Sequence, residues 1–334
     1  MDYKLVSGDN HIDITVCPPD LWSSQAPAKW KLLVPRAEAL DDGLHWFIEG
    51  KDVSMWNGIG PGFNKYQKGR LARVDKMYDL GFYTGYHREA EPRPTTPELR
   101  IEDLDKDGID AEIVYGILGA NEKIQDGDLR GWVYQKYNDW VADFARRADP
   151  HRVFPLAAIP NNDPQLAAEE VLRCAKMGLR GGDLPLQRMA FPLVHHAWYP
   201  VWEAAAECHF PISFHSTGFK GYRPADNAAM ADEYVLEFRM VASALFQVEG
   251  MEVLVAIIAS GACEKYPDFR FVLGESGVTW IPYVLDRFDT EYEDRGTALG
   301  FSMKPSDYFR RNGVATYQQD QFIGDMASLI GGDN

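Results

Sequence analysis

Two histidines and two carboxylates in this 334-residue chain are placed where they could bind a divalent metal ion. Asp9 and His11 are two residues apart in the segment SGDNHID. Because residues two apart on an extended segment point to the same side, this carboxylate and imidazole can reach one ion. His215 ends the run PISFH, and Glu275 follows the run RFVLG. Imidazoles combined with carboxylates suit Zn²⁺, Mn²⁺ or Fe²⁺.

An α/β fold with parallel strands would position these residues. From residue 98 onward, short β-branched runs alternate with segments of helical period, which is typical of strand–helix–strand units. The predicted strands cover residues 4–7, 111–117, 152–159, 179–184, 211–215, 270–274 and 313–317. The clearest helix signal is Asp163 as N-cap, followed by Pro164 and ended by Gly178. We predict one (β/α)₈ TIM barrel over residues 1–334; a doubly wound open sheet is the alternative.

A barrel would bring the four candidate ligands to one face, because barrel enzymes carry their chemistry at the C-terminal ends of the strands. The predicted metal ligands, each following a predicted strand, are Asp9, His11, His215 and Glu275. Among them, His215 and Glu275 are also the predicted catalytic residues. The alternatives are a turn capped by Asp9, a buried hydrogen-bonded His215 and an ion pair between Glu275 and an arginine.

Three further residues are weaker candidates for substrate contacts. His196 lies after the fourth predicted strand, Asp320 lies after the seventh, and His87 lies in a segment outside the strand–helix alternation. For Asp320, helix capping is the alternative, and we favour it.

The alternation fails between residues 18 and 97, where Trp, Gly and Pro are frequent. The segment LHWFIEGKDVSMW predicts a hairpin that turns at Gly50 and Lys51. We interpret residues 18–97 as an insertion after the first strand, either a lid or an oligomer contact. The aromatic stretch over residues 22–56 favours a homo- or hetero-oligomer, because contiguous apolar surface is typical of interfaces.

Composition restricts the partners. Lys and Arg number 34 against 50 Asp and Glu, a net charge of −16, which disfavours nucleic acid and anionic membranes. Cys17, Cys174, Cys208 and Cys263 form no CxxC pair, which argues against a disulfide framework or a cysteine zinc site and favours the cytoplasm. A thiolate nucleophile is not predicted among them. A small molecule is the expected substrate.

Four segments together resemble the amidohydrolase-related family, in the branch that includes aminocarboxymuconate-semialdehyde decarboxylase and the hydroxybenzoate-type decarboxylases. They are SGDNHIDITVCPPDLW at 7–22, PELRIEDLDKDGIDAE at 97–112, PISFH at 211–215 and YPDFRFVLGESGVTWIP at 266–282. The resemblance implies a distorted (β/α)₈ barrel with one catalytic divalent metal, commonly zinc or manganese. By position, Asp9 and His11 match the family's first-strand ligand pair, and His215 matches its fifth-strand histidine.

The chain departs from the family pattern in three ways. Asp9 with His11 stands where many relatives have two histidines, a harder ligand set that favours Mn or Fe. Glu275 stands where the decarboxylases resembling this chain usually carry a histidine. In the family, a segment like residues 331–334 precedes an eighth strand that delivers an aspartate. That strand is missing here, and we expect truncation because its absence would expose strand edges.

These observations predict a metal-dependent hydrolase or non-oxidative decarboxylase for a small carboxylated or aromatic substrate. Two alternatives stay open. Asp9, His11 and His215 also form the two-histidine, one-carboxylate set of non-haem iron oxygenases, and Glu275 could bridge a second ion in a dinuclear iron or manganese oxygenase. The chain could also be a metal-poor subunit that stabilises an active paralogue.

Overall fold

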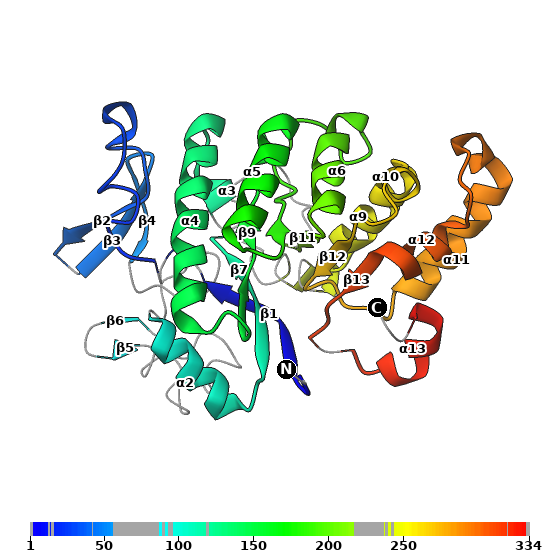
Figure 1. The fold of residues 1–334 in the computed structure, drawn as a ribbon, viewed down its shortest axis with the longest axis horizontal. Helices are drawn as coiled ribbons and strands as arrows, with labels where there is room; N and C mark the ends of the chain where they lie inside the picture. Colours follow the sequence, from blue (N-terminus) through cyan, green and yellow to red (C-terminus); the bar gives the residue numbers. More distant parts are fainter. Residues whose placement is uncertain are drawn as a thin grey trace. The chain divides into compact units, whose positions relative to one another are not determined.

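The computed structural model describes residues 3–12, 14, 17–41, 43–55, 87–88, 91–92, 96–117, 120–216, 237, 240–241, 244–318 and 320–331. The chain divides into two compact units, Met1–Arg188 and Met189–Asn334. Figure 1 labels helices and strands of both units. Within the described ranges, no helix is long and apolar enough to cross a membrane.

The first unit combines short parallel strands with long helices. Its strands are β1 (Val6–Ile12), β2 (Arg36–Leu40), β3 (Gly43–Ile48), β4 (Lys51–Met55), β5 (His87–Arg88), β6 (Glu91–Pro92), β7 (Ala111–Gly116), β8 (Val153–Pro155), β9 (Ala157–Ala158) and β10 (Gly182–Asp183). Its helices are η2 (Ala28–Trp30), α2 (Pro97–Asp107), α3 (Ala120–Lys123), α4 (Gly127–Ala148) and α5 (Pro164–Met177). β1, β7 and β8 pair in parallel, and so do β9 and β10. The predicted parallel α/β alternation is confirmed for this unit.

Strand β1 is longer than its prediction. The predicted strand ends at Ser7, whereas β1 continues to Ile12, so Asp9 and His11 lie within the strand rather than after it. Its register against β7 shifts between Ser7 and Asn10, which marks a β-bulge. Gly, Asp and Asn are depleted in strands. Because the bulged segment contains these residues, strand propensity did not predict that β1 continues beyond Ser7.

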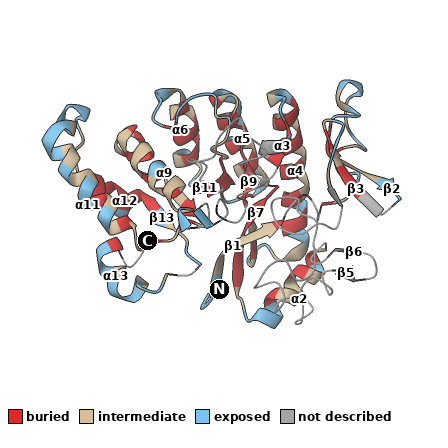
Figure 2. Cartoon of the chain, turned by 180° about the vertical axis from the view of Figure 1, so that it is seen from behind, coloured by how far each residue is buried: buried red, intermediate tan, exposed pale blue. Residues whose placement is uncertain are grey.

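The helices of this unit begin and end at the residues that their local chemistry selects. The Asp163 side chain accepts hydrogen bonds from two backbone N–H groups of the first turn of α5, and Gly178 ends that helix with φ of 98°. Asp126 caps α4 in the same way. The two helices run side by side (Figure 1), and β7 is buried along most of its length (Figure 2).

The described part of the insertion forms a small antiparallel sheet of β2, β3 and β4. The predicted hairpin is confirmed, but its turn is at Glu49 and Gly50, both at positive φ, one residue before the predicted Gly50 and Lys51. Trp22 and Trp46 are fully buried with their rings 6.0 Å apart, and the Trp22 indole N–H donates to the Val133 carbonyl of α4. These two indoles therefore pack inside the unit and supply no exposed apolar surface. Most of the remaining insertion, residues 56–86, lies outside the described residues.

The second unit is built around the parallel strands β11 (Ile212–His215), β12 (Phe271–Gly274) and β13 (Gly313–Ala315). Its helices are η3 (His196–Trp198), α6 (Tyr199–Glu207), α9 (Val248–Ala259), α10 (Ala262–Lys265), α11 (Ile281–Glu291), η4 (Tyr292–Gly296), η5 (Thr297–Leu299), α12 (Pro305–Asn312) and α13 (Ile323–Ile330). Aromatic side chains fill its core, with Phe271 between Phe269 and Phe309. The three predicted strands of this part of the chain are confirmed.

Candidate metal centre

The structure brings Asp9 and His11 together on β1. Asp9 Oδ1 lies 3.4 Å from His11 Nε2, and the two side chains are 12% and 26% exposed, respectively. The His11 ring also lies 5.9 Å from the ring of Tyr115 on β7. Both side chains of the pair are therefore half-buried.

The residue between them, Asn10, contacts a buried ion pair. Arg100 of α2 binds Glu112 of β7 through two hydrogen bonds of 2.6 and 2.7 Å. The same guanidinium donates to the His11 carbonyl at 2.9 Å, and the Asn10 amide donates to Glu112 Oε2 at 2.5 Å. Neither Arg100 nor Glu112 is among the residues predicted from the sequence. The available signal was Glu112, a carboxylate inside the apolar run AEIVYGI.

The second unit brings His215 and Glu275 together. His215 ends β11 and pairs in register with Gly274, so Glu275 begins just beyond the neighbouring strand β12. His215 Nδ1 lies 2.7 Å from the Ser216 carbonyl oxygen, which can only accept, so Nδ1 carries the proton. Nε2 therefore presents its lone pair, and it lies 3.5 Å from Glu275 Oε2. This tautomer is the one that a metal ligand requires.

Glu275 is held in an uncommon backbone conformation. Its φ is 50°, in the left-handed region that residues with a Cβ rarely adopt, and such conformations concentrate at functional sites. Its backbone N–H donates to Thr316 Oγ1 at 2.9 Å, and its Oε1 accepts from the Gln318 amide at 2.6 Å. One carboxylate oxygen is thus fixed by Gln318 while the other faces His215.

Asp320 supports the segment that follows Glu275. Its carboxylate accepts hydrogen bonds from the backbone N–H groups of Val278 and Thr279 at 2.5 and 3.3 Å, and from the Thr279 hydroxyl at 2.7 Å. These bonds brace the turn that leads from Glu275 into α11. The helix capping favoured from the sequence is not seen: α13 begins after Phe322 without a side-chain cap, and Asp320 binds the segment before α11 instead.

The two remaining substrate candidates are not brought near these pairs by any described contact. His196 is exposed and stacks on Tyr199, with ring centroids 4.5 Å apart. His87 begins the two-residue strand β5, and its side chain lies outside the described residues. Both stay predictions without structural support.

Each pair of side chains fits a shared metal ion. Two ligand atoms about 2.1 Å from one ion, at a tetrahedral angle, are about 3.4 Å apart. The measured separations are 3.4 Å for Asp9 and His11 and 3.5 Å for His215 and Glu275. The donors are imidazole nitrogen and carboxylate oxygen, the types that Mn²⁺, Fe²⁺ and Zn²⁺ accept.

Two of the cysteines, Cys174 and Cys263, are poorly suited to nucleophilic chemistry. Burial raises the pKa of the Cys263 thiol to about 12, and burial also raises the pKa of Cys174, where the nearby Glu170 carboxylate adds to the effect. Both thiols therefore stay protonated near neutral pH.

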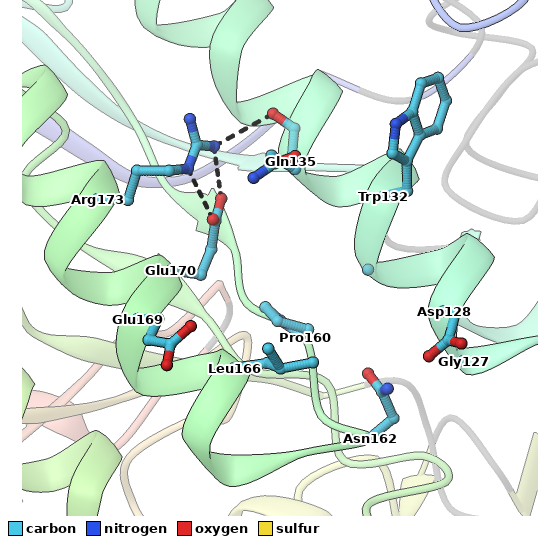
Figure 3. A pocket seen from close by; sticks show the side chains of 11 residues that line it. Gly127, Asp128, Trp132, Gln135, Pro160, Asn162, Leu166, Glu169, Glu170 and Arg173 are labelled. Carbon is cyan, nitrogen blue, oxygen red and sulfur yellow. Dashed lines mark hydrogen bonds and ion pairs between the residues drawn. The ribbon is translucent and has the colours of Figure 1, made fainter. Parts of the chain in front are cut away.

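A groove of about 350 Å³ lies between α4 and α5 in the first unit (Figure 3). Its lining residues are Gly127, Asp128, Gly131, Trp132, Gln135, Pro160, Asn162, Leu166, Glu169, Glu170 and Arg173. The Glu170 carboxylate is bound by Arg173, which also donates to the Gln135 carbonyl (Figure 3). None of the predicted site residues lines this groove, so it is distinct from the candidate metal ligands.

Comparison with known proteins identifies relatives over most of the chain. The amidohydrolase family profile matches residues 41–322. A gamma-resorcylate decarboxylase from Polaromonas sp. is 28% identical over 248 residues, which cover 71% of this chain and 74% of that protein. That relative and this chain are therefore similar over most of their lengths.

Solved structures match the fold. An amidohydrolase from Mycobacterium avium subsp. paratuberculosis gives a TM-score of 0.72 at 16% identity, over 100% of this chain and 88% of that one. A dihydroxybenzoic acid decarboxylase from Polaromonas sp., solved with manganese and the inhibitor 2-nitroresorcinol, gives a TM-score of 0.57 at 22% identity, over 77% and 79%. The predicted α/β fold therefore agrees with the folds of these enzymes.

Proposed function

Because this chain belongs to the amidohydrolase family, we propose that it is a metal-dependent enzyme that decarboxylates a small hydroxylated aromatic acid. The observation that carries the proposal is the Asp9–His11 pair, a carboxylate and an imidazole 3.4 Å apart on one strand. The similarity to a gamma-resorcylate decarboxylase favours decarboxylation over other reactions of the family. The proposal includes a distorted (β/α)₈ barrel as the complete architecture.

We assign Asp9, His11 and His215 as ligands of one divalent ion. His215 presents Nε2 because Nδ1 donates to the Ser216 carbonyl. Manganese is the first candidate, since the set combines one hard carboxylate with two borderline imidazoles and a structurally similar decarboxylase was solved with manganese. When bound, the ion would supply positive charge that holds the substrate carboxylate and a neighbouring oxygen.

Glu275 is the proposed proton donor. In decarboxylation, the bond between the ring carbon and the carboxylate breaks, a proton joins the ring carbon, and the carboxyl group leaves as CO₂. A protonated Glu275 can supply that proton from Oε2, and solvent then restores it. The hydrogen bond from Gln318 to Oε1 would keep Oε2 directed to the reaction.

Hydrolysis is the second candidate. The position of the Glu275 carboxylate, 3.5 Å from the His215 imidazole, favours it. A carboxylate beside an imidazole can act as a general base for water, and the exposed fraction of 26% for the Glu275 side chain allows water to reach it. In this reaction Glu275 would accept a proton rather than donate one.

Metal analysis combined with a product assay tests the proposal. The metal-free chain is loaded with Mn²⁺, Zn²⁺ or Fe²⁺, and ions per chain are counted by mass spectrometry. CO₂ release is then measured with hydroxylated benzoates, such as 2,6-dihydroxybenzoate, beside a panel of esters and amides. We expect about one ion per chain and equal amounts of CO₂ and decarboxylated product.

Other outcomes contradict the proposal in distinct ways. Turnover of esters or amides alone would establish hydrolysis. About two ions per chain with oxygen uptake would establish an oxygenase. A folded chain that binds no metal and turns over nothing would favour the role of a subunit for an active paralogue.

A further inference from the structure

Arg100 and Glu112 form an ion pair in the interior of the first unit. Arg100 is 6% exposed and Glu112 is 1% exposed, and the pair is joined by two parallel N–H···O bonds. The two residues come from α2 and β7, and together they bind two sites on β1: the His11 carbonyl and the Asn10 amide. One buried cluster thus connects three elements at the strand that carries Asp9 and His11.

Stability does not account for such a pair. Removing two charges from water is costly, and replacing a buried ion pair with apolar residues of similar volume is often neutral or stabilising. A planar guanidinium has instead a geometric advantage, because its fixed fork can bind a carboxylate and still donate to a third acceptor. Arg100 does this with Glu112 and the His11 carbonyl.

The place where the cluster acts is the β-bulge. Ser7 pairs with Glu112 and Asn10 pairs with Val114, so three steps on β1 oppose two steps on β7. A bulge leaves the strand locally unpaired and can change the direction of its side chains. The contacts of Asn10 and His11 with the cluster restrain the bulged segment immediately around Asp9.

We propose that Asn10, Arg100 and Glu112 are positioning residues that set the geometry of the Asp9–His11 pair for its metal ion. The proposal rests on the proposed function, because it takes Asp9 and His11 as ligands. Arg100 acts on the backbone of His11, and Glu112 acts through Asn10. Neither residue needs to touch the metal or the substrate.

The test uses a variant that removes the charges together. In R100M/E112M, no single buried charge is left behind, so the chain should fold, which circular dichroism and a denaturant midpoint check. Manganese affinity, measured by competition with a chromophoric chelator, should fall about 10- to 100-fold. Arg100→Lys keeps the charge without the fork and should give an intermediate loss.

A matched control removes an ion pair elsewhere in the same unit. Arg173 binds Glu170 and reaches Asp139 of α4. The R173M/E170M variant should keep manganese affinity within about twofold of wild type, although it also loses an arginine–glutamate pair, here a partly exposed one. Backbone hydrogen exchange of the metal-free proteins supplies a second readout: R100M/E112M should accelerate exchange over residues 6–12, and the control should not.

The possible results separate this inference from the proposed function. A folded R100M/E112M variant that binds manganese as tightly as the wild type would overturn the positioning role. A wild-type chain that binds no manganese, or an Asp9→Ala variant that binds it equally well, would overturn the ligand assignment. If the ligand assignment is wrong, hydrogen exchange still tests the role of the cluster. Unchanged protection of residues 6–12 in R100M/E112M would show that the cluster does not hold the bulge.

Discussion

Asp9 and His11 lie within a paired strand, whereas His215 and Glu275 meet just where two strands end. The first pair is restrained by a buried ion pair from two other elements. Glu275, in contrast, is held by Thr316 and Gln318 from the segment after β13, in a left-handed backbone conformation.

This difference matches two chemical tasks. A metal ligand must stay in one place, and rigid elements with buried supporting contacts achieve this. A proton carrier must approach the reacting atom and release its proton, which a partly exposed side chain at the end of a strand can do. We therefore interpret β1 as the platform for two of the ligands, and Glu275, beside the third ligand His215, as the proton carrier.

The largest effect should come from removing a ligand. Asp9→Ala, His11→Ala and His215→Ala should each weaken manganese binding by about 100-fold or more, because each removes a direct donor. Chelator competition measures the affinity, and circular dichroism checks the fold. Tight binding retained in all three variants would contradict the ligand assignment.

Glu275→Gln should separate proton transfer from metal binding. We expect manganese affinity and stoichiometry to persist while kcat falls by about 10² or more, since the amide cannot exchange the proton. Steady-state rates and metal content measured on the same sample test this. A parallel drop in ions per chain would instead make Glu275 a ligand and remove the contrast between the two regions.

Gln318→Ala should have a smaller effect on the same group. Loss of the hydrogen bond to Glu275 Oε1 should lower kcat by about 3- to 10-fold, the equivalent of about 1 kcal/mol, and leave metal affinity unchanged. Gln165→Ala is the matched control, because it removes an amide–carboxylate contact with Glu169 on the exposed side of α5. Equal rates for both variants would show that Gln318 does not direct Glu275.

The smallest effect concerns the start of β1. Asp110 accepts hydrogen bonds from the backbone N–H groups of Leu5 and Lys4, which lower the pKa of its carboxyl below the ordinary 3.8. The ionised form therefore stabilises the fold above pH 3.8, and this contribution is lost as pH falls through the lower folded pKa. Denaturant unfolding from about pH 2 to 5 should show less pH dependence for Asp110→Asn than for the wild type. Parallel curves would contradict this role.

Local patterns predicted most of the described elements. Asp163, Pro164 and Gly178 bound α5 as expected, because capping depends on neighbouring residues alone. The strands β7, β11 and β12 were predicted because each is an apolar run bounded by turn residues, a pattern that depends only on neighbouring residues. β1 was cut short at Ser7 because its bulge, with Gly8, Asp9 and Asn10, breaks the local pattern.

Residue type and spacing by themselves determined that Asp9 and His11 share one side of an extended segment, that His215 ends a strand and that Glu275 follows another. Only the tertiary structure decided what surrounds them. Arg100 and Glu112 are 12 residues apart from each other and far along the chain from His11, whose carbonyl lies 89 residues from Arg100. Such partners meet through packing of α2, β7 and β1, and no local propensity encodes that meeting.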